Sequence, residues 1–164
     1  MKWIKSLLSI NLDDPRSTAY KTREGEAIQV DEAFKAWTCG DLAQMLDAVS
    51  TETHLIDRHF LLQRIVSETY KLRNDPHHRD LCLQHARLHI DEFDDIAPVL
   101  KKEMDGTLPR VTTFQHFATI LAENKEYDRA ILVCEKAMDY GLHDGTKSGF
   151  KGRVKRIEKQ KEKG

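Results

Sequence analysis

Two long stretches of the chain repeat apolar and small residues at helical spacing, and a short polar turn divides each of them. In the clearer stretch, residues three, four and seven positions apart share one helix face: Phe114, Phe117, Ala118 and Leu121. After the polar turn at 124–126, small side chains at Ala130, Cys134 and Ala137 form a narrow stripe. Such a stripe lets two helix backbones approach closely. The sequence therefore predicts an antiparallel helix hairpin over about residues 112–140.

A looser version of the same pattern covers about residues 55–93. Asp75 can cap a helix that begins with Pro76, because proline lacks only an amide donor that is unpaired at that position anyway. Leu83 and Ala86 then provide the apolar stripe of that second helix. A second hairpin is expected here.

Both stretches resemble the tetratricopeptide repeat, a hairpin with an aromatic, apolar-small pattern in its first helix and small residues in its second. The matching residues in the second stretch are Phe114, Phe117, Ala118, Leu121, Tyr127, Ala130, Cys134 and Ala137. Those in the first are Val66, Ser67, Tyr70, Leu83 and Ala86. Ala118, Leu142 and Arg79 stand where the repeat has glycine, proline and a small residue. The resemblance implies an all-α fold of stacked hairpins that holds partners on its surface.

The two hairpins are too far apart to be adjacent repeats. Ser67 and Ala118 occupy equivalent positions 51 residues apart, whereas the repeat period is about 34. One extra helix at about 95–105, with Pro98 in its first turn, is expected to fill the difference. A basic capping helix is expected at about 146–162, where Phe150 and Ile157 would cover the stack. This closing segment looks like those of uncharacterised bacterial repeat-like proteins.

The N-terminal part reads differently from the rest. Residues 1–29 are interpreted as a short helix followed by a polar linker over 15–29, and residues 30–164 as a single helical domain. Asp31 and Asp41 are each positioned to cap a short helix ahead of the first hairpin. The first ten residues lack the continuous apolar core and cleavage site of a signal peptide, no run of eighteen apolar residues exists, and the three cysteines are widely separated. A cytoplasmic protein without a transmembrane segment is expected.

The charge is strongly asymmetric. From Thr146 onward there are eight basic and two acidic residues, a net charge of plus six, so residues 1–145 carry minus seven of the total of minus one. Nucleic-acid binding by this basic helix is the alternative to a protein-binding role. No aromatic residue follows Phe150, so the basic run offers no stacking platform, and a solvated capping helix is favoured.

Metal and enzyme hypotheses rest on little. Cys82, His85 and His89 are spaced three and four apart on one predicted helix, but no fourth ligand is evident. The repeat pattern places them away from the tight stripe, as a partly exposed pair of histidines beside a cysteine. No phosphate loop, nucleophile elbow or metalloprotease motif occurs. The sequence predicts no enzymatic activity, metal or cofactor.

The predicted function therefore lies in a surface. In stacked hairpins, the first helix of each pair lines the partner-binding side. Positions off the apolar stripe on those helices are Arg64, Glu68, Lys71, Gln115, Thr119 and Glu123. They predict a mixed polar groove that suits a helix or an extended segment of a protein or peptide partner. A homo-oligomer in which a second copy fills the groove is equally compatible with the sequence.

Overall fold

The computed structural model describes residues 18–164, so the predicted N-terminal helix lies outside the described residues. One β-hairpin comes first, formed by β1 (Tyr20–Arg23) and β2 (Glu26–Gln29). Eight helices follow within the described residues: α1 (Glu32–Cys39), α2 (Leu42–Ala48), α3 (Leu55–Lys71), α4 (Pro76–Asp91), α5 (Phe93–Glu103), α6 (Thr112–Glu123), α7 (Tyr127–Asp139) and α8 (Gly149–Lys163). The mostly α-helical fold predicted from the sequence is confirmed.

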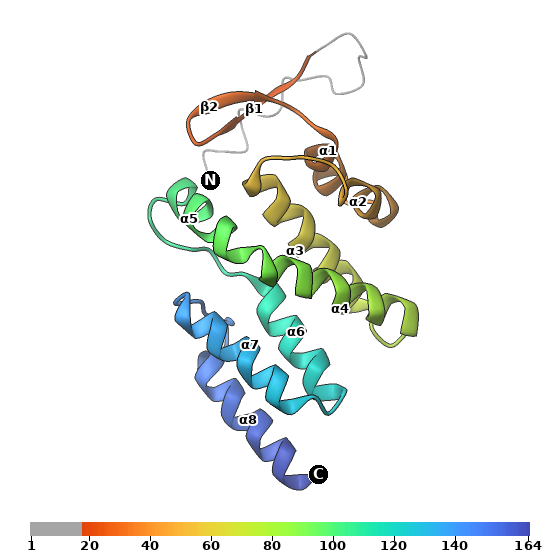
Figure 1. Cartoon of the computed structure of the whole chain (residues 1–164), viewed down its shortest axis with the longest axis vertical. Coiled ribbons are helices and arrows are strands. Elements are labelled where there is room, and N and C mark those ends of the chain that lie inside the picture. The colour runs from red at the N-terminus through yellow and green to blue at the C-terminus, as the bar shows by residue number, and fades with distance from the viewer. Residues whose placement is uncertain (1–17) are drawn as a thin grey trace.

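The helices form an elongated stack (Figure 1). The β-hairpin and the α1–α2 pair lie at one end, and α8 lies at the other. The long hairpins expected from the sequence are α3–α4 and α6–α7. Helix α6 contacts both α3 and α4, and α8 contacts mainly α7 and, to a smaller extent, α6. Each helix after α3 thus packs against at least one helix that precedes it.

Three helices begin with the aspartate caps that the sequence predicts. The carboxylates of Asp31, Asp41 and Asp75 accept hydrogen bonds from the backbone amides of Phe34, Gln44 and His78. Each bond satisfies one of the amide groups that have no partner inside the helix, and such a cap contributes about 1 kcal/mol. Pro76 occupies the first turn of α4, as expected.

The core is continuous from α3 to α8. Phe93 and Phe114 are fully buried at its centre, where their rings meet edge to face with 5.3 Å between centroids. Burying each such side chain contributes about 1.5–3 kcal/mol. The stripe of Ala130, Cys134 and Ala137 is completely buried, as predicted. A smaller core, which includes Met45, Leu61 and Ile65, joins α1 and α2 to α3.

The extra helix between the hairpins starts two residues earlier than expected, and this changes the role of its proline. Because α5 begins at Phe93, Pro98 lies inside the helix instead of in its first turn. Its ring is exposed, while Phe93, Ile96 and Leu100 are buried. Asp94 and Asp95 lie in the first turn, where carboxylates interact favourably with the helix dipole. Burial of Phe93 and these two charges favour the early start.

The predicted polar linker is wrong for residues 20–29, which form the antiparallel β-hairpin. Its turn is Glu24-Gly25, and both residues have positive φ, 51° and 84°. Such a turn has the twist that a two-residue hairpin needs. The strands are short and largely exposed, so their composition resembles that of a linker.

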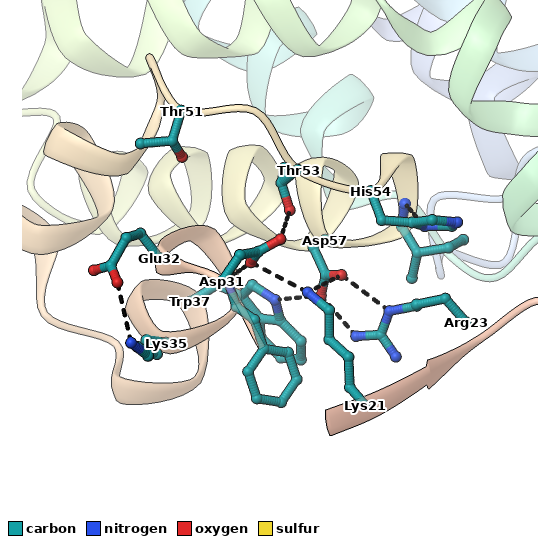
Figure 2. A network of polar contacts seen from close by, with 12 residues as sticks. Lys21, Arg23, Asp31, Glu32, Lys35, Trp37, Thr51, Thr53, His54 and Asp57 are labelled. Carbon is teal, nitrogen blue, oxygen red and sulfur yellow. Dashed lines mark hydrogen bonds and ion pairs between the residues drawn. The ribbon is translucent and has the colours of Figure 1, made fainter. Parts of the chain in front are cut away.

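A buried carboxylate attaches this hairpin to the helices (Figure 2). Asp57, in the first turn of α3, is fully buried and lies 2.7 Å from the Lys21 ammonium. Arg23 donates two hydrogen bonds to the same carboxylate, at 3.0 and 2.6 Å, and the Trp37 indole donates a third at 3.0 Å. Burial alone would raise the pKa of Asp57, but these donors outweigh it and hold the pKa below its usual value. The carboxylate therefore stays charged and ties β1, α1 and α3 together.

Candidate functional site

The expectation of a partly exposed pair of histidines is wrong, because His85 and His89 are buried together with Cys82. They face the core together with Ala86. The buried face of α4 is therefore rotated from the one that the repeat pattern predicts, which contains Leu83 and Ala86. The His85 ring donates through Nδ1 to the Leu81 carbonyl at 2.7 Å, and His89 turns toward other residues. Among residues 18–164, no three metal-ligating side chains come together in a suitable arrangement.

His89 belongs to a buried chain of polar side chains. Its Nε2 lies 3.0 Å from Nδ1 of His59, and its Nδ1 lies 2.8 Å from the Thr113 hydroxyl. Burial lowers the pKa of His59 to about 4 and places that of His89 well below its ordinary value. Both rings are thus neutral at physiological pH. The chain links α3, α4 and α6 inside the core and is closed to a ligand from solvent.

The three predicted partner-binding residues on α3 do not form a groove. Arg64 is directed toward α1, where its Nη1 donates to the Trp37 carbonyl at 2.6 Å and its guanidinium covers Gly40. Glu68 and Lys71 form an ion pair of 2.9 Å with each other. Helix α1 packs against α3 and occupies the side that the repeat pattern leaves open to a partner.

The three predicted residues on α6 have separate surroundings. Gln115 accepts a hydrogen bond from Arg110 at 3.1 Å and does not line the main groove. Thr119 and Glu123 do line it. The structure therefore brings two of the six predicted residues together at one site.

That site is a groove of about 420 Å³ between α6 and α8. Its apolar floor is formed by Ala118, Ala122 and Ile157, and Tyr127 at the start of α7 also lines it. Its polar lining consists of Thr119, Glu123, Arg153, Arg156 and Gln160. The volume lies in the range of ordinary ligand-binding clefts.

Two arginines of α8, Arg153 and Arg156, line the groove, and hydrogen bonds hold the first more firmly than the second. Arg153 donates through Nε to the buried carboxylate of Asp144 at 3.0 Å and through Nη1 to the Thr119 hydroxyl at 3.0 Å. Burial would raise the pKa of Asp144, but Thr146 and Arg153 together keep it below its usual value. Arg156 has a hydroxyl partner, Ser148, at 3.0 Å, and no carboxylate partner among the described residues. Arg153 is therefore positioned by the fold, whereas the charge of Arg156 remains uncompensated.

The carboxylate lining the groove is already neutralised. Glu123 forms ion pairs of 3.1 Å with Arg73 and 3.0 Å with Arg79. Burial would raise the pKa of Glu123, but the two arginines hold it below its usual value. Arg79 also donates to Asn124 at 2.7 Å. The arginine that departs from the repeat pattern thus joins α4 to the end of α6.

A neutral histidine on α6, His116, lies near several arginines. The His116 ring stacks on the Tyr70 ring with 3.9 Å between centroids. The guanidinium of Arg73 also lies over the Tyr70 ring, 4.1 Å from its centroid. Burial, with the nearby charges of Arg110, Arg153 and Arg73, lowers the pKa of His116 to about 4. The charges of Arg73, Arg110 and Arg153 therefore all act on this one imidazole of α6.

Sequence reasoning assigned no binding role to seven of the nine residues that line the groove: Ala118, Ala122, Tyr127, Arg153, Arg156, Ile157 and Gln160. The sequence predicts that Phe150 and Ile157 of the basic helix cover the stack, and both side chains are buried. The signal for the groove is the spacing of Arg153, Arg156 and Gln160, three and four residues apart on one helix face beside Ile157.

No protein-family model matches the chain, and no curated protein or solved structure is significantly similar to it. Within residues 18–164, no helix has the length and apolar character needed to cross a lipid bilayer.

Proposed function

We propose that the protein is a non-enzymatic, tetratricopeptide-repeat-like interaction module that binds a segment of another protein in the groove between α6 and α8. The observation that carries the proposal is the groove itself, with an apolar floor and charged groups around it. Helix-in-groove recognition needs both features, because apolar anchors supply affinity and flanking charges fix orientation.

The packing of the helices supports the same role. α6 and α8 lie on either side of the groove, and Thr119 and Arg153 are bonded across it. A binding surface formed by two rigid helices is held in place before a partner arrives, which lowers the entropic cost of association. We place the protein in the cytoplasm, where reduced cysteines such as buried Cys82 and Cys134 are ordinary.

A photo-crosslinking residue at Gln160 tests the proposal. The tagged protein carrying it is irradiated in an extract of its native host, with and without nuclease, and the adducts are identified. The matched control carries the same residue at Lys101, which is exposed on α5. We expect a defined protein to crosslink from Gln160 in both extracts and not from Lys101. Adducts that are equal at both positions would contradict the proposal.

Nucleic-acid association remains the second candidate, because α8 carries seven basic and two acidic residues. It predicts that recovery of partners depends on intact nucleic acid and falls steeply with salt. Crosslinks from Gln160 that disappear after nuclease treatment would favour it over the groove.

A further inference from the structure

We infer that the groove takes an acidic amphipathic segment of a partner protein, one that places apolar side chains on the floor and carboxylates against α8. This inference rests on the proposed function and specifies the chemistry of its partner. It is carried by the distribution of charge around the groove and by the small size of the floor residues.

The polar residues of α8 that line the groove are two cations and one amide. Arg153, Arg156 and Gln160 recur at spacings of three and four residues, which places them along one helix face. The two acidic residues of α8, Glu158 and Glu162, each lie two positions away from a member of this line, so they project from the other side of the helix. They do not neutralise it.

The remaining charges near the groove leave a positive surplus. Arg73, Arg79, Arg153 and Arg156 face two carboxylates, Glu123 and Asp144. Asp144 is buried under Arg153 and is closed to an incoming ligand. Arg156 therefore presents a guanidinium whose strongest kind of partner, a carboxylate, has to come from outside.

The exposed lysines of α8 repel one another, and an anionic partner would relieve this repulsion. Lys151, Lys155, Lys159 and Lys163 are exposed at successive spacings of four on α8, where like charges destabilise a helix by about 0.2–0.5 kcal/mol per pair. Lys161, by contrast, is paired with Asp128 at 2.6 Å. The lysines extend the positive field beyond the groove and would steer an acidic chain toward it.

The floor of the groove favours a polypeptide over a phosphate chain. Ala122 is partly exposed on this floor, Ala118 and Ile157 are buried beneath it, and the small size of the two alanines leaves room for an apolar side chain from a partner. A phosphodiester backbone has no apolar branch to fill that space. A helix with leucines or phenylalanines on one side and glutamates on the other satisfies both the floor and the cations.

Selection from a library displaying random peptides of about 16 residues, against the full chain, tests the inference; a segment of that length forms a helix of about four turns. We expect the enriched peptides to be net acidic, with apolar residues at helical spacing. Arg156→Glu should weaken their binding at least about tenfold in fluorescence anisotropy, because it opposes like charges across the interface. Ala122→Phe, which fills the floor without changing charge, should weaken it similarly.

Lys101→Glu is the matched control, since it makes the same change of charge at an exposed position on α5, outside both the groove and the lysine row of α8. We expect it to change binding far less than Arg156→Glu. Equal effects of the two variants would overturn the inference in favour of general attraction to a basic surface.

The outcomes separate the two proposals. If the enriched peptides are neutral or basic and Ala122→Phe abolishes their binding, the inference of an acidic partner is overturned. The proposed function of the groove is then still supported. Failure to enrich any peptide, combined with binding of a labelled single-stranded oligonucleotide, would overturn both. Self-association that Arg156→Glu abolishes would identify a second copy as the occupant and also overturn the inference.

Discussion

Because His59 and His89 are buried and neutral, we expect the free energy of unfolding to fall as the pH is lowered, at pH values above those at which the carboxyl groups titrate. Burial lowers the pKa of His59 from 6.5 to about 4, so below pH 6.5 the unfolded chain takes up a proton that the native protein refuses. The stability is fully present above pH 6.5 and is lost progressively as the pH falls toward about 4. At pH 5 this shift alone corresponds to a loss of about 2 kcal/mol relative to pH 7.5.

The measurement is urea unfolding of the wild type and His59→Gln at pH 7.5 and pH 5. The amide of glutamine can hydrogen-bond but does not titrate, so His59→Gln should lose about 2 kcal/mol less than the wild type between the two pH values. Comparing the two losses removes any fixed cost of the substitution. His77→Gln, at an exposed position near the start of α4, is the matched control and should behave as the wild type.

One result would refute this reasoning: an equal loss of stability in the wild type and His59→Gln. It would mean that the His59 ring accepts a proton in the native state as easily as in the unfolded chain. The lowered pKa values of Asp57, Glu123 and Asp144 do not interfere, because their contribution is lost only as the pH falls below about 4.5, the upper limit of their ordinary values.

Three further predictions concern the attachment of the hairpin, one glycine and the thiols. Asp57→Asn should cost about 3–5 kcal/mol, because it removes the carboxylate shared by Lys21 and Arg23 and leaves the buried Lys21 ammonium with Asp31 alone, and it should speed amide exchange across residues 20–29. Gly40→Ala should destabilise the fold by about 1 kcal/mol more than Gly106→Ala in urea unfolding. Both glycines have φ near 80°, but only at Gly40 would a Cβ lie 2.4 Å from a guanidinium and displace it from its carbonyl partner. Iodoacetamide should label exposed Cys39 in the native protein and leave Cys134, whose pKa burial raises to about 11, unmodified until unfolding; mass spectrometry distinguishes the two.

The helices of this protein were predictable because their signals are local. Asp75 and Pro76 define the start of α4 within two residues, and the small residues of α7 are buried at the positions that their spacing indicates. The face of α4 was less predictable. Histidine is compatible with either surface or core, and His89 is buried because His59 and Thr113, 30 and 24 residues away in sequence, offer partners.

The β-hairpin and the groove depend on contacts between distant residues. No residue next to Lys21 in the sequence indicates that its ammonium is buried, because its carboxylate partners are Asp31, at the start of α1, and Asp57, on α3. The predicted role of Arg64 assumed an open face on α3, which the Trp37–Phe60 stack, at 4.9 Å between ring centroids, shows to be covered by α1. The groove itself requires the position of α8 relative to α6, which no single segment encodes.

The exposed lysines of α8 also determine whether the stack can be lengthened. Phe150 and Ile157 use the apolar edge of this helix to close the core. Another hairpin packed on its far side would have to bury Lys151, Lys155 and Lys159 without counter-charges, at a cost of several kcal/mol for each ion. A design that extends the array with additional repeats therefore has to begin by replacing these three lysines with apolar residues.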